Sequence, residues 1–312
     1  MNYMPIRIAG TGSYLPKTVK SNEEISRLNN CDPTWAERKI GIKSRHISDA
    51  DEKSSDLAVA AARKAIENSG CDLHCIDLII VATATPDMQA PSTAAIVQSK
   101  LGILKCTSFD VAAVCSGFLY ASSVAIAMLN LGQFSTAMVI GVDQFSKITD
   151  WTKKDSFFFG DGAGAVIYKK DDGANNYFRF HTLNDPVGVR NFQAQHSGHF
   201  EMAGREVYDS ALNLITSSIN YLFDRSPFTR LDVTHVVPHQ PSIHLLKAIS
   251  VEASIPFDKF HWNMDRAANT AGATIPILLD EIHQQGKINR GDLCLMLAAG
   301  AGMTGGSALF TF

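Results

Sequence analysis

The chain has 312 residues, of which 46% are hydrophobic and 19% are charged, and its formal net charge is −3. This length can bury a large core in one domain or two, and the slight negative charge excludes the basic field typical of nucleic-acid binding. We find no secretory signal pattern and no apolar run of membrane-spanning length, so we expect neither a nucleic-acid partner nor a membrane partner.

The first half of the chain predicts alternating helices and strands. Residues 54–69 predict a helix that is capped by Ser54 or Ser55 and ended by Gly70. Residues 76–81 form an apolar run that is typical of a strand buried on both faces.

The segment FDVAAVCSGFLYA, residues 109–121, places Cys115 where a strand-like run meets a helix-like run. A free cysteine is often a small buried filler of the core. At the start of a helix, however, backbone N–H groups stabilise a thiolate and lower the thiol pKa, as a nucleophile requires. This segment alone leaves both interpretations open.

A second series of elements repeats the first at an offset of about 155 residues. The matching segments are 75–86 with 230–241, 109–117 with 264–272, and 159–168 with 301–310. Helices and apolar strands alternate in both copies, which predicts sheets covered by helices on both sides. We therefore expect two similar α/β halves, residues 1–170 and residues 171–312.

Two polar residues lie in loops that the repeat should bring close to Cys115. His239 follows the predicted strand at 233–237, and Asn269 precedes a buried helix of the second half. Taken singly, His239 is more often structural and Asn269 is more often a turn residue. A duplicated unit gathers its matching loops about a pseudo-twofold axis, so we expect all three residues in one pocket.

Two glycine-rich segments suggest nucleotide binding but fail on context. GAGMTG, residues 300–305, matches G-x-G-x-x-G, yet a strand follows it where a dinucleotide site needs a helix. GDGAGA, residues 160–165, lacks the Lys-Ser/Thr pair of a phosphate loop. Both are interpreted as tight turns.

The cysteine pattern predicts neither disulfides nor a metal. The cysteines are Cys31, Cys71, Cys75, Cys106, Cys115 and Cys294. Six cysteines spread over this length form no disulfide framework, so a reducing cytoplasm is the expected setting. The segment CDLHC at 71–75 has no second ligand pair at a suitable spacing, so no metal is expected.

The order and spacing of these motifs resemble those of the β-ketoacyl-acyl carrier protein synthase III enzymes of the thiolase superfamily. The resemblance rests on IAGTGSYLP, TWAERKIGIKSRHI, FDVAAVCSGF, FGDGAGAV, VVPHQPS, AANTAGATIP and the closing glycine turn. It implies a thiolase-like five-layered α/β/α/β/α fold built from two duplicated halves, a homodimer, and a catalytic set of Cys115, His239 and Asn269.

The resemblance also implies the reaction, that of an acyltransferase. An acyl primer, carried by coenzyme A or a carrier protein, would acylate Cys115, with the backbone N–H groups of Cys115 and Ala301 as the oxyanion hole. Malonyl-acyl carrier protein would then lose carbon dioxide, and His239 and Asn269 would donate hydrogen bonds to its enolate. No cofactor is expected beyond these carriers, and the pathway would make fatty acids, a specialised lipid or a polyketide.

Binding residues follow from the same resemblance. The expected coenzyme A site comprises Trp35, Lys39, Lys153, Gly204, Arg205 and Ser242. Lysines stand at two positions where the family usually has arginines, so we expect altered coenzyme A binding, because lysine lacks the planar fork of arginine. Carrier docking is expected at Arg205, His244 and Lys247, a thinner basic patch that favours a dedicated carrier or a relocated docking surface.

The expected acyl pocket comprises Ala90, Phe118, Phe157, Met303 and Gly305. In the short-chain members a bulky aromatic residue at the place of Ala90 crosses the dimer interface and closes the acyl pocket, and a tryptophan often stands at the place of Gly305. Both residues are small here, so we expect a preference for medium-length or branched primers over acetyl. The alternative is that Met88, Met303 or Phe157 refills the space.

Other functions were weighed against this one. A papain-like protease shares the order Cys, His, Asn, but its signature around the cysteine is absent. A non-decarboxylating acyltransferase of the same fold and an inactive heterodimer partner stay open as alternatives.

Overall fold

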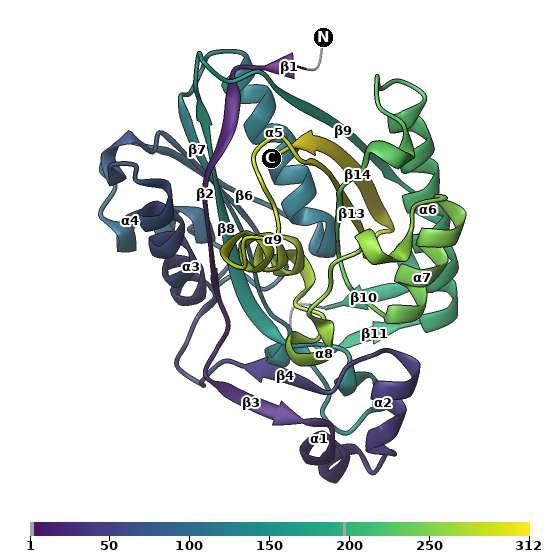
Figure 1. Cartoon of the computed structure of the whole chain (residues 1–312). Coiled ribbons are helices and arrows are strands. Elements are labelled where there is room, and N and C mark those ends of the chain that lie inside the picture. Colours follow the sequence, from purple (N-terminus) through teal and green to yellow (C-terminus); the bar gives the residue numbers. More distant parts are fainter. Residues whose placement is uncertain (1–2, 196–197) are drawn as a thin grey trace.

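The computed structural model describes residues 3–195 and 198–312, which form two five-stranded sheets (Figure 1). The first sheet, in spatial order, contains β2 (Ile6–Tyr14), β8 (Asp161–Lys170), β7 (Thr136–Gln144), β5 (Leu78–Ala82) and β6 (Thr107–Val111). The second contains β1 (Tyr3–Met4), β9 (Asn176–Asn184), β14 (Thr304–Thr311), β13 (Leu293–Gly300) and β12 (His235–Pro238). The short strand β1 pairs with β9, so the start of the described chain joins the sheet of the second half.

Helices complete five alternating layers (Figure 1). The outer helices α3 (Ser54–Ser69) and α4 (Thr93–Leu101) cover the first sheet, and α6 (Gly204–Phe223) and α7 (Ile243–Glu252) cover the second. Between the sheets lie α5 (Gly117–Asn130) and α9 (Thr274–Gln284). These layers confirm the predicted five-layered fold, and each half contributes one central helix.

Strand directions also repeat between the halves. In the first sheet β7 is parallel to β5 and antiparallel to β8, and in the second β13 is parallel to β12 and antiparallel to β14. The strand that would match β6 is reduced to an isolated bridge between Val236 and Phe260.

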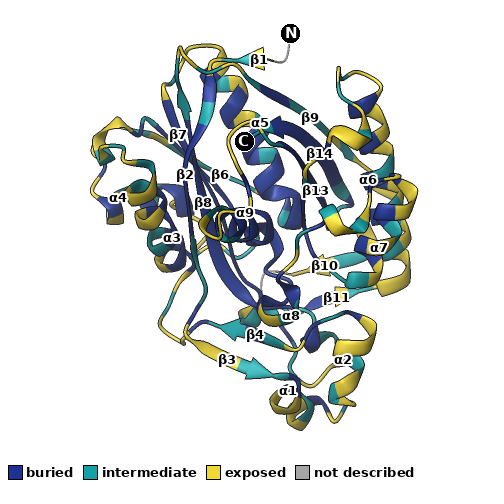
Figure 2. Ribbon diagram, viewed as in Figure 1, coloured by how far each residue is buried: buried dark blue, intermediate teal, exposed yellow. Residues whose placement is uncertain are grey.

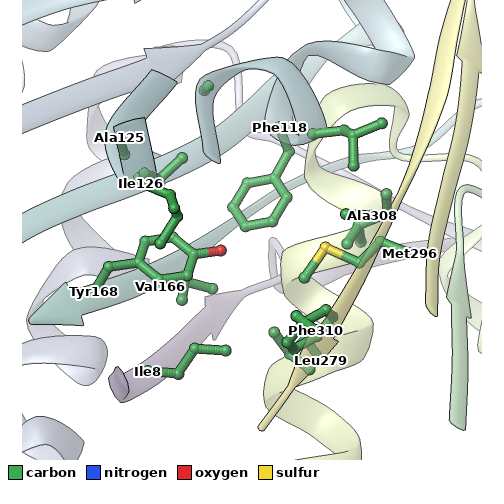
Figure 3. Packing of buried hydrophobic residues seen from close by; sticks show 14 of the residues in the cluster. Ile8, Phe118, Ala125, Ile126, Val166, Tyr168, Leu279, Met296, Ala308 and Phe310 are labelled. Carbon is green, nitrogen blue, oxygen red and sulfur yellow. The ribbon is translucent and has the colours of Figure 1, made fainter. Parts of the chain in front are cut away.

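The core lies where the central helices meet both sheets. Figure 2 shows α5 and α9 largely buried, whereas the outer helices expose one face. Phe118 of α5 packs beside Tyr168 of β8, Met296 of β13 and Phe310 of β14 (Figure 3). One continuous cluster thus joins residues from both halves.

Glycines let the second central helix approach the first sheet without side chains between them. A side chain at Gly141 of β7 would overlap the carbonyl of Gly272, just before α9, and one at Gly164 of β8 would overlap the backbone at Pro276 and Ile277. The two halves are therefore in backbone-to-backbone contact at these points.

Two small substructures outside the five-stranded sheets contain predicted site residues or border the cavity described below. The antiparallel strands β3 (Thr18–Ser21) and β4 (Ser44–Ile47) enclose α1 (Asn22–Asn29) and α2 (Pro33–Lys39) in the chain, and the four elements form a projecting lobe (Figure 1). The hairpin β10 (Phe192–Ala194) and β11 (Phe200–Met202) precedes α6. A short helix, α8 (Met264–Ala267), and several 3-10 turns complete the elements used below.

Candidate active site

Cys115 lies at the junction between the first sheet and the first central helix. The chain leaves β6 at Val111, forms the 3-10 turn η2 (Val114–Ser116), and enters α5 at Gly117. Val114 has a left-handed backbone with φ of 48°, which is costly for a β-branched residue and is sustained only by its surroundings. Cys115 is 7% exposed at the start of the helix.

His239 and Asn269 come from the second half. His239 follows β12, and its backbone N–H donates to Leu297 O on β13 at 2.7 Å. Asn269 is held by two backbone bonds to the segment that precedes β8: its N–H donates to Phe158 O, and its carbonyl accepts from Gly160 N, both at 3.0 Å. Ala268, just before it, has a left-handed backbone with φ of 58°.

The two polar side chains are directly bonded. His239 Nε2 lies 3.0 Å from Asn269 Oδ1, and the backbone N–H of Ala271 donates to the same oxygen at 2.8 Å. Because that backbone donor identifies the amide oxygen, Nε2 of His239 carries the proton and donates. The NH2 group of Asn269 is then left as a second side-chain donor.

Burial governs the protonation of the site. Burial raises the pKa of the Cys115 thiol, and the nearby Asp143 carboxylate raises it further, so the resting residue is a thiol despite the helix start. Burial lowers the pKa of His239 to about 4, against a smaller opposing effect of its bond to Asn269. The imidazole is therefore neutral at pH 7.

Cys115, His239 and Asn269 line one cavity of about 280 Å³. Six other predicted site residues also border it: Lys39, Gly204, Ser242, His244, Ala301 and Met303. The remaining wall is apolar and includes Phe158, Phe159, Phe192, Met202, Val207, Tyr208 and Leu245. An apolar chamber with a few convergent polar groups fits an acyl substrate.

Three residues expected in the acyl pocket or near it, Phe118, Phe157 and Gly305, lie elsewhere in this chain. Phe118 belongs to the central core, where it packs against both sheets (Figure 3). Phe157 packs beneath Trp35, with 6.2 Å between ring centroids. Gly305 pairs with Ala299 within the second sheet. Ala90 is exposed on this chain, so its expected place across a dimer interface stays a prediction. Met303 is thus the member of that set that borders the cavity.

A different lysine from the one expected lies against the Trp35 ring of the lobe. Lys154 Nζ lies 3.9 Å from the centroid of the Trp35 ring, whereas Lys153 Nζ lies 3.8 Å from Asp150 Oδ2. Both lysines are exposed, as are Arg205 and Lys247 on the outer surface. Trp35 and Lys154 thus form a cation–π pair at the lobe.

Sequence reasoning missed a second apolar cavity, of about 240 Å³, beside the first. Its wall comprises Ala84, Ala112, Val114, Phe145, Ile148, Phe192, Ala194 and Ala301. Phe192 and Ala301 border both cavities. Cys115 packs in the same cluster as Phe145, Phe159 and Phe200.

No group of three or more His, Cys, Asp or Glu residues suited to a metal occurs in residues 3–195 and 198–312. In that same part of the chain, no helix is long and apolar enough to cross a membrane.

Comparisons with known proteins show the family of the chain. The model of the family "3-Oxoacyl-[acyl-carrier-protein (ACP)] synthase III" matches residues 109–186, and the model of its C-terminal part matches residues 223–312. The chain is 37% identical to the beta-ketoacyl-[acyl-carrier-protein] synthase III of Xanthomonas campestris pv. campestris, over 98% of each chain.

Solved structures give the same result. The 3-oxoacyl-[acyl-carrier-protein] synthase III of Aquifex aeolicus VF5 superposes with a TM-score of 0.95 at 32% identity, covering 98% of this chain and 100% of that chain. The priming beta-ketosynthase of the R1128 polyketide biosynthetic pathway superposes with a TM-score of 0.94 at 26% identity, covering 99% and 96%. The chain therefore belongs to the 3-oxoacyl-[acyl-carrier-protein] synthase III family.

Proposed function

We propose that this protein is an acyltransferase that joins an acyl primer to malonyl-acyl carrier protein by decarboxylative condensation. The observation that carries the proposal is the convergence of Cys115 with the bonded pair His239–Asn269 in one apolar cavity. A nucleophile and two enolate donors are what the two half-reactions need.

In the first half-reaction, Cys115 Sγ attacks the thioester carbonyl of the primer. The carrier thiol leaves with a proton, and the thiol proton of Cys115 is lost, so the acyl group is transferred without net redox change. We assign the oxyanion to the backbone N–H groups of Cys115 and Ala301. In support, a side chain at Gly300 would lie 2.9 Å from Cys115 N, so the glycine keeps this N–H accessible.

In the second half-reaction, the malonyl thioester releases carbon dioxide, and the electron pair of the broken C–C bond forms an enolate. The enolate carbon bonds to the acyl carbonyl carbon, and Cys115 leaves as the thiolate. His239 Nε2–H would exchange its bond to Asn269 Oδ1 for one to the enolate oxygen, and the Asn269 NH2 group would donate to the same enolate oxygen. A neutral His239 supports this role, because its N–H donates without adding a charge to a buried site.

The same proposal covers the carriers. Coenzyme A would bind at Trp35 and Lys154, and its arm would pass Lys39, Gly204 and Ser242 on the way to Cys115. The acidic surface of the acyl carrier protein would dock at Arg205, His244 and Lys247. The apolar walls support medium-length or branched primers, and a cytoplasmic homodimer is the assembly we propose.

Mass spectrometry of the protein mixed with acyl-CoA and malonyl-carrier tests the function directly. We expect an acyl adduct on Cys115 and a 3-oxoacyl-carrier product. Cys115→Ala should lose both, whereas Asn269→Ala should keep the adduct and lose the product. A condensation product from Cys115→Ala would refute the mechanism. An adduct that passes to other acceptors without carbon dioxide release would favour the non-decarboxylating alternative.

A further inference from the structure

Asp143 is a buried carboxylate behind the catalytic cavity, near the end of β7. Its Oδ1 accepts from Ala84 N at 2.7 Å and from the hydroxyls of Thr83 and Thr85 at 3.3 and 3.2 Å. Its Oδ2 accepts from Gly272 N at 2.8 Å. Four donors thus converge on a group that, when ionised, can only accept.

The carboxylate joins segments from both halves of the chain. Residues 83–85 follow β5, and Ala84 borders the second cavity. Gly272 lies in the turn of Asn269, where Ala271 N donates to the Asn269 side chain. Besides the two backbone bonds of Asn269 to Phe158 and Gly160, that turn is held by one bond to the Asn269 amide and by one bond to Asp143.

The backbone just before Gly272 needs such support. Ala271 has a left-handed backbone with φ of 47°, as Val114 and Ala268 do, and such conformations persist only where the surroundings hold them. A side chain at Gly272 would lie 3.0 Å from Asp143 Oδ2 and 3.1 Å from Val114 O. The turn of Asn269 and the loop of Cys115 consequently meet at this glycine.

Electrostatics argue that Asp143 does not serve to activate the nucleophile. Burial raises the pKa of Asp143 to about 7, against the opposing effect of its hydrogen bonds. Its negative charge raises the pKa of the Cys115 thiol and so disfavours the thiolate. Asp143 therefore does not help to form the thiolate. Its four hydrogen bonds to the surrounding loops explain its presence at this position.

We propose that Asp143 is a positioning residue that holds the Asn269 turn against residues 83–85 and acts on condensation more than on acylation of Cys115. The inference rests on the proposed function. Asp143 touches no reacting atom in this account, and it acts through Gly272 and the Asn269 turn.

Asp143→Asn tests the proposal with little change in shape. Whichever way the new amide turns, its NH2 group must face a backbone N–H, either that of Gly272 or that of Ala84. We expect acyl-enzyme formation within about threefold of wild type and a condensation rate at least about thirtyfold lower, which corresponds to roughly 2 kcal/mol. The two rates are measured separately, by acyl-adduct mass and by single-turnover product release.

A matched control separates positioning from loss of stability. Asp280 of α9 is also buried and accepts from Thr11 Oγ1 at 2.8 Å and Ser13 Oγ at 2.6 Å. Asp280→Asn should lower the unfolding temperature while leaving the ratio of the two half-reactions unchanged.

Alkylation of Cys115 by iodoacetamide gives a readout that needs no substrate. Removing the charge of Asp143 should shift the pH profile of alkylation to lower pH, and His239, in the same cavity, stays neutral over that range. A wild-type ratio of half-reactions in Asp143→Asn overturns the proposal, whereas the alkylation profile tests only the effect of the Asp143 charge on the Cys115 thiol.

Two other outcomes also test the proposal: a variant that does not fold, and a wild-type protein that forms no condensation product. If Asp143→Asn does not fold, Thr83→Val removes one donor, and the ratio of half-reactions must move in the same direction for the proposal to stand. If wild type forms no condensation product, the proposed function fails, whereas the alkylation profile still decides whether Asp143 acts on this site.

Discussion

Phe192→Ala should lengthen the preferred primer, because Phe192 borders both apolar cavities. Its ring stacks on Phe200, with centroids 5.6 Å apart, and so closes the catalytic cavity of about 280 Å³ toward the neighbouring one of about 240 Å³. Replacing the ring by a methyl group should open the space beyond it to the end of an acyl chain.

The size of the effect follows from the burial of the added carbons. Each methylene that enters the cavity gains about 0.8 kcal/mol, which is about fourfold in kcat/KM. A primer longer by two carbons should therefore gain roughly fifteenfold relative to the shorter primer in the variant.

The assay is kcat/KM for acetyl, hexanoyl, octanoyl and decanoyl primers in wild type and Phe192→Ala. Gln193→Ala is the matched control, since its exposed side chain belongs to the same short strand but lines neither cavity. A ratio of octanoyl to hexanoyl that changes less than twofold would refute the idea that Phe192 limits chain length. Other residues lining the catalytic cavity would then have to limit the length of the acyl chain.

Three other predictions address binding, acid stability and the carrier. Lys154→Ala should raise KM for acyl-CoA about two- to fivefold, the size of one exposed cation–π contact, and Lys153→Ala should raise it less. Burial in the folded state lowers the pKa of His239 to about 4, so the free energy of unfolding falls as the pH drops from about 6.5 to 4. His239→Gln should make this fall about 3 kcal/mol smaller, as measured by urea unfolding at pH 7 and pH 4. Arg205→Ala should raise KM for malonyl-carrier more at low salt than at high salt, and equal KM values at both would argue for docking elsewhere.

The repeat made the layers and the catalytic loops predictable from the sequence. Matching motifs fix which strand ends face one another, so the sequence alone predicts that Cys115, His239 and Asn269 lie in one pocket. Local chemistry was less predictable. The helix at 54–69 begins after Lys53, because Asp87 accepts from Ser55 N and Oγ and takes that serine out of a capping role.

The pocket walls depend on packing that no motif encodes. The hairpin of Phe192 and Phe200 is set by tertiary contacts with Phe145 and Phe159, so its part in the acyl site left no pattern in the sequence. Likewise, the 3-10 turn η4 (Lys154–Phe157) determines which of two adjacent lysines reaches the Trp35 ring. Adjacent side chains in this turn point in different directions, so the spacing of residues in the sequence does not show whether Lys153 or Lys154 reaches the ring.

The backbone contacts at Gly141 and Gly164 have a consequence for how the molecule unfolds. Because Gly272 and the start of α9 rest directly on β7 and β8, neither half has a complete surface without the other. We therefore expect one cooperative unfolding transition, with no folded fragment from a cut near residue 170. An alanine side chain at Gly141 or Gly164 would push the two halves apart. Thermal unfolding of such a variant should then show two transitions where the native protein shows one.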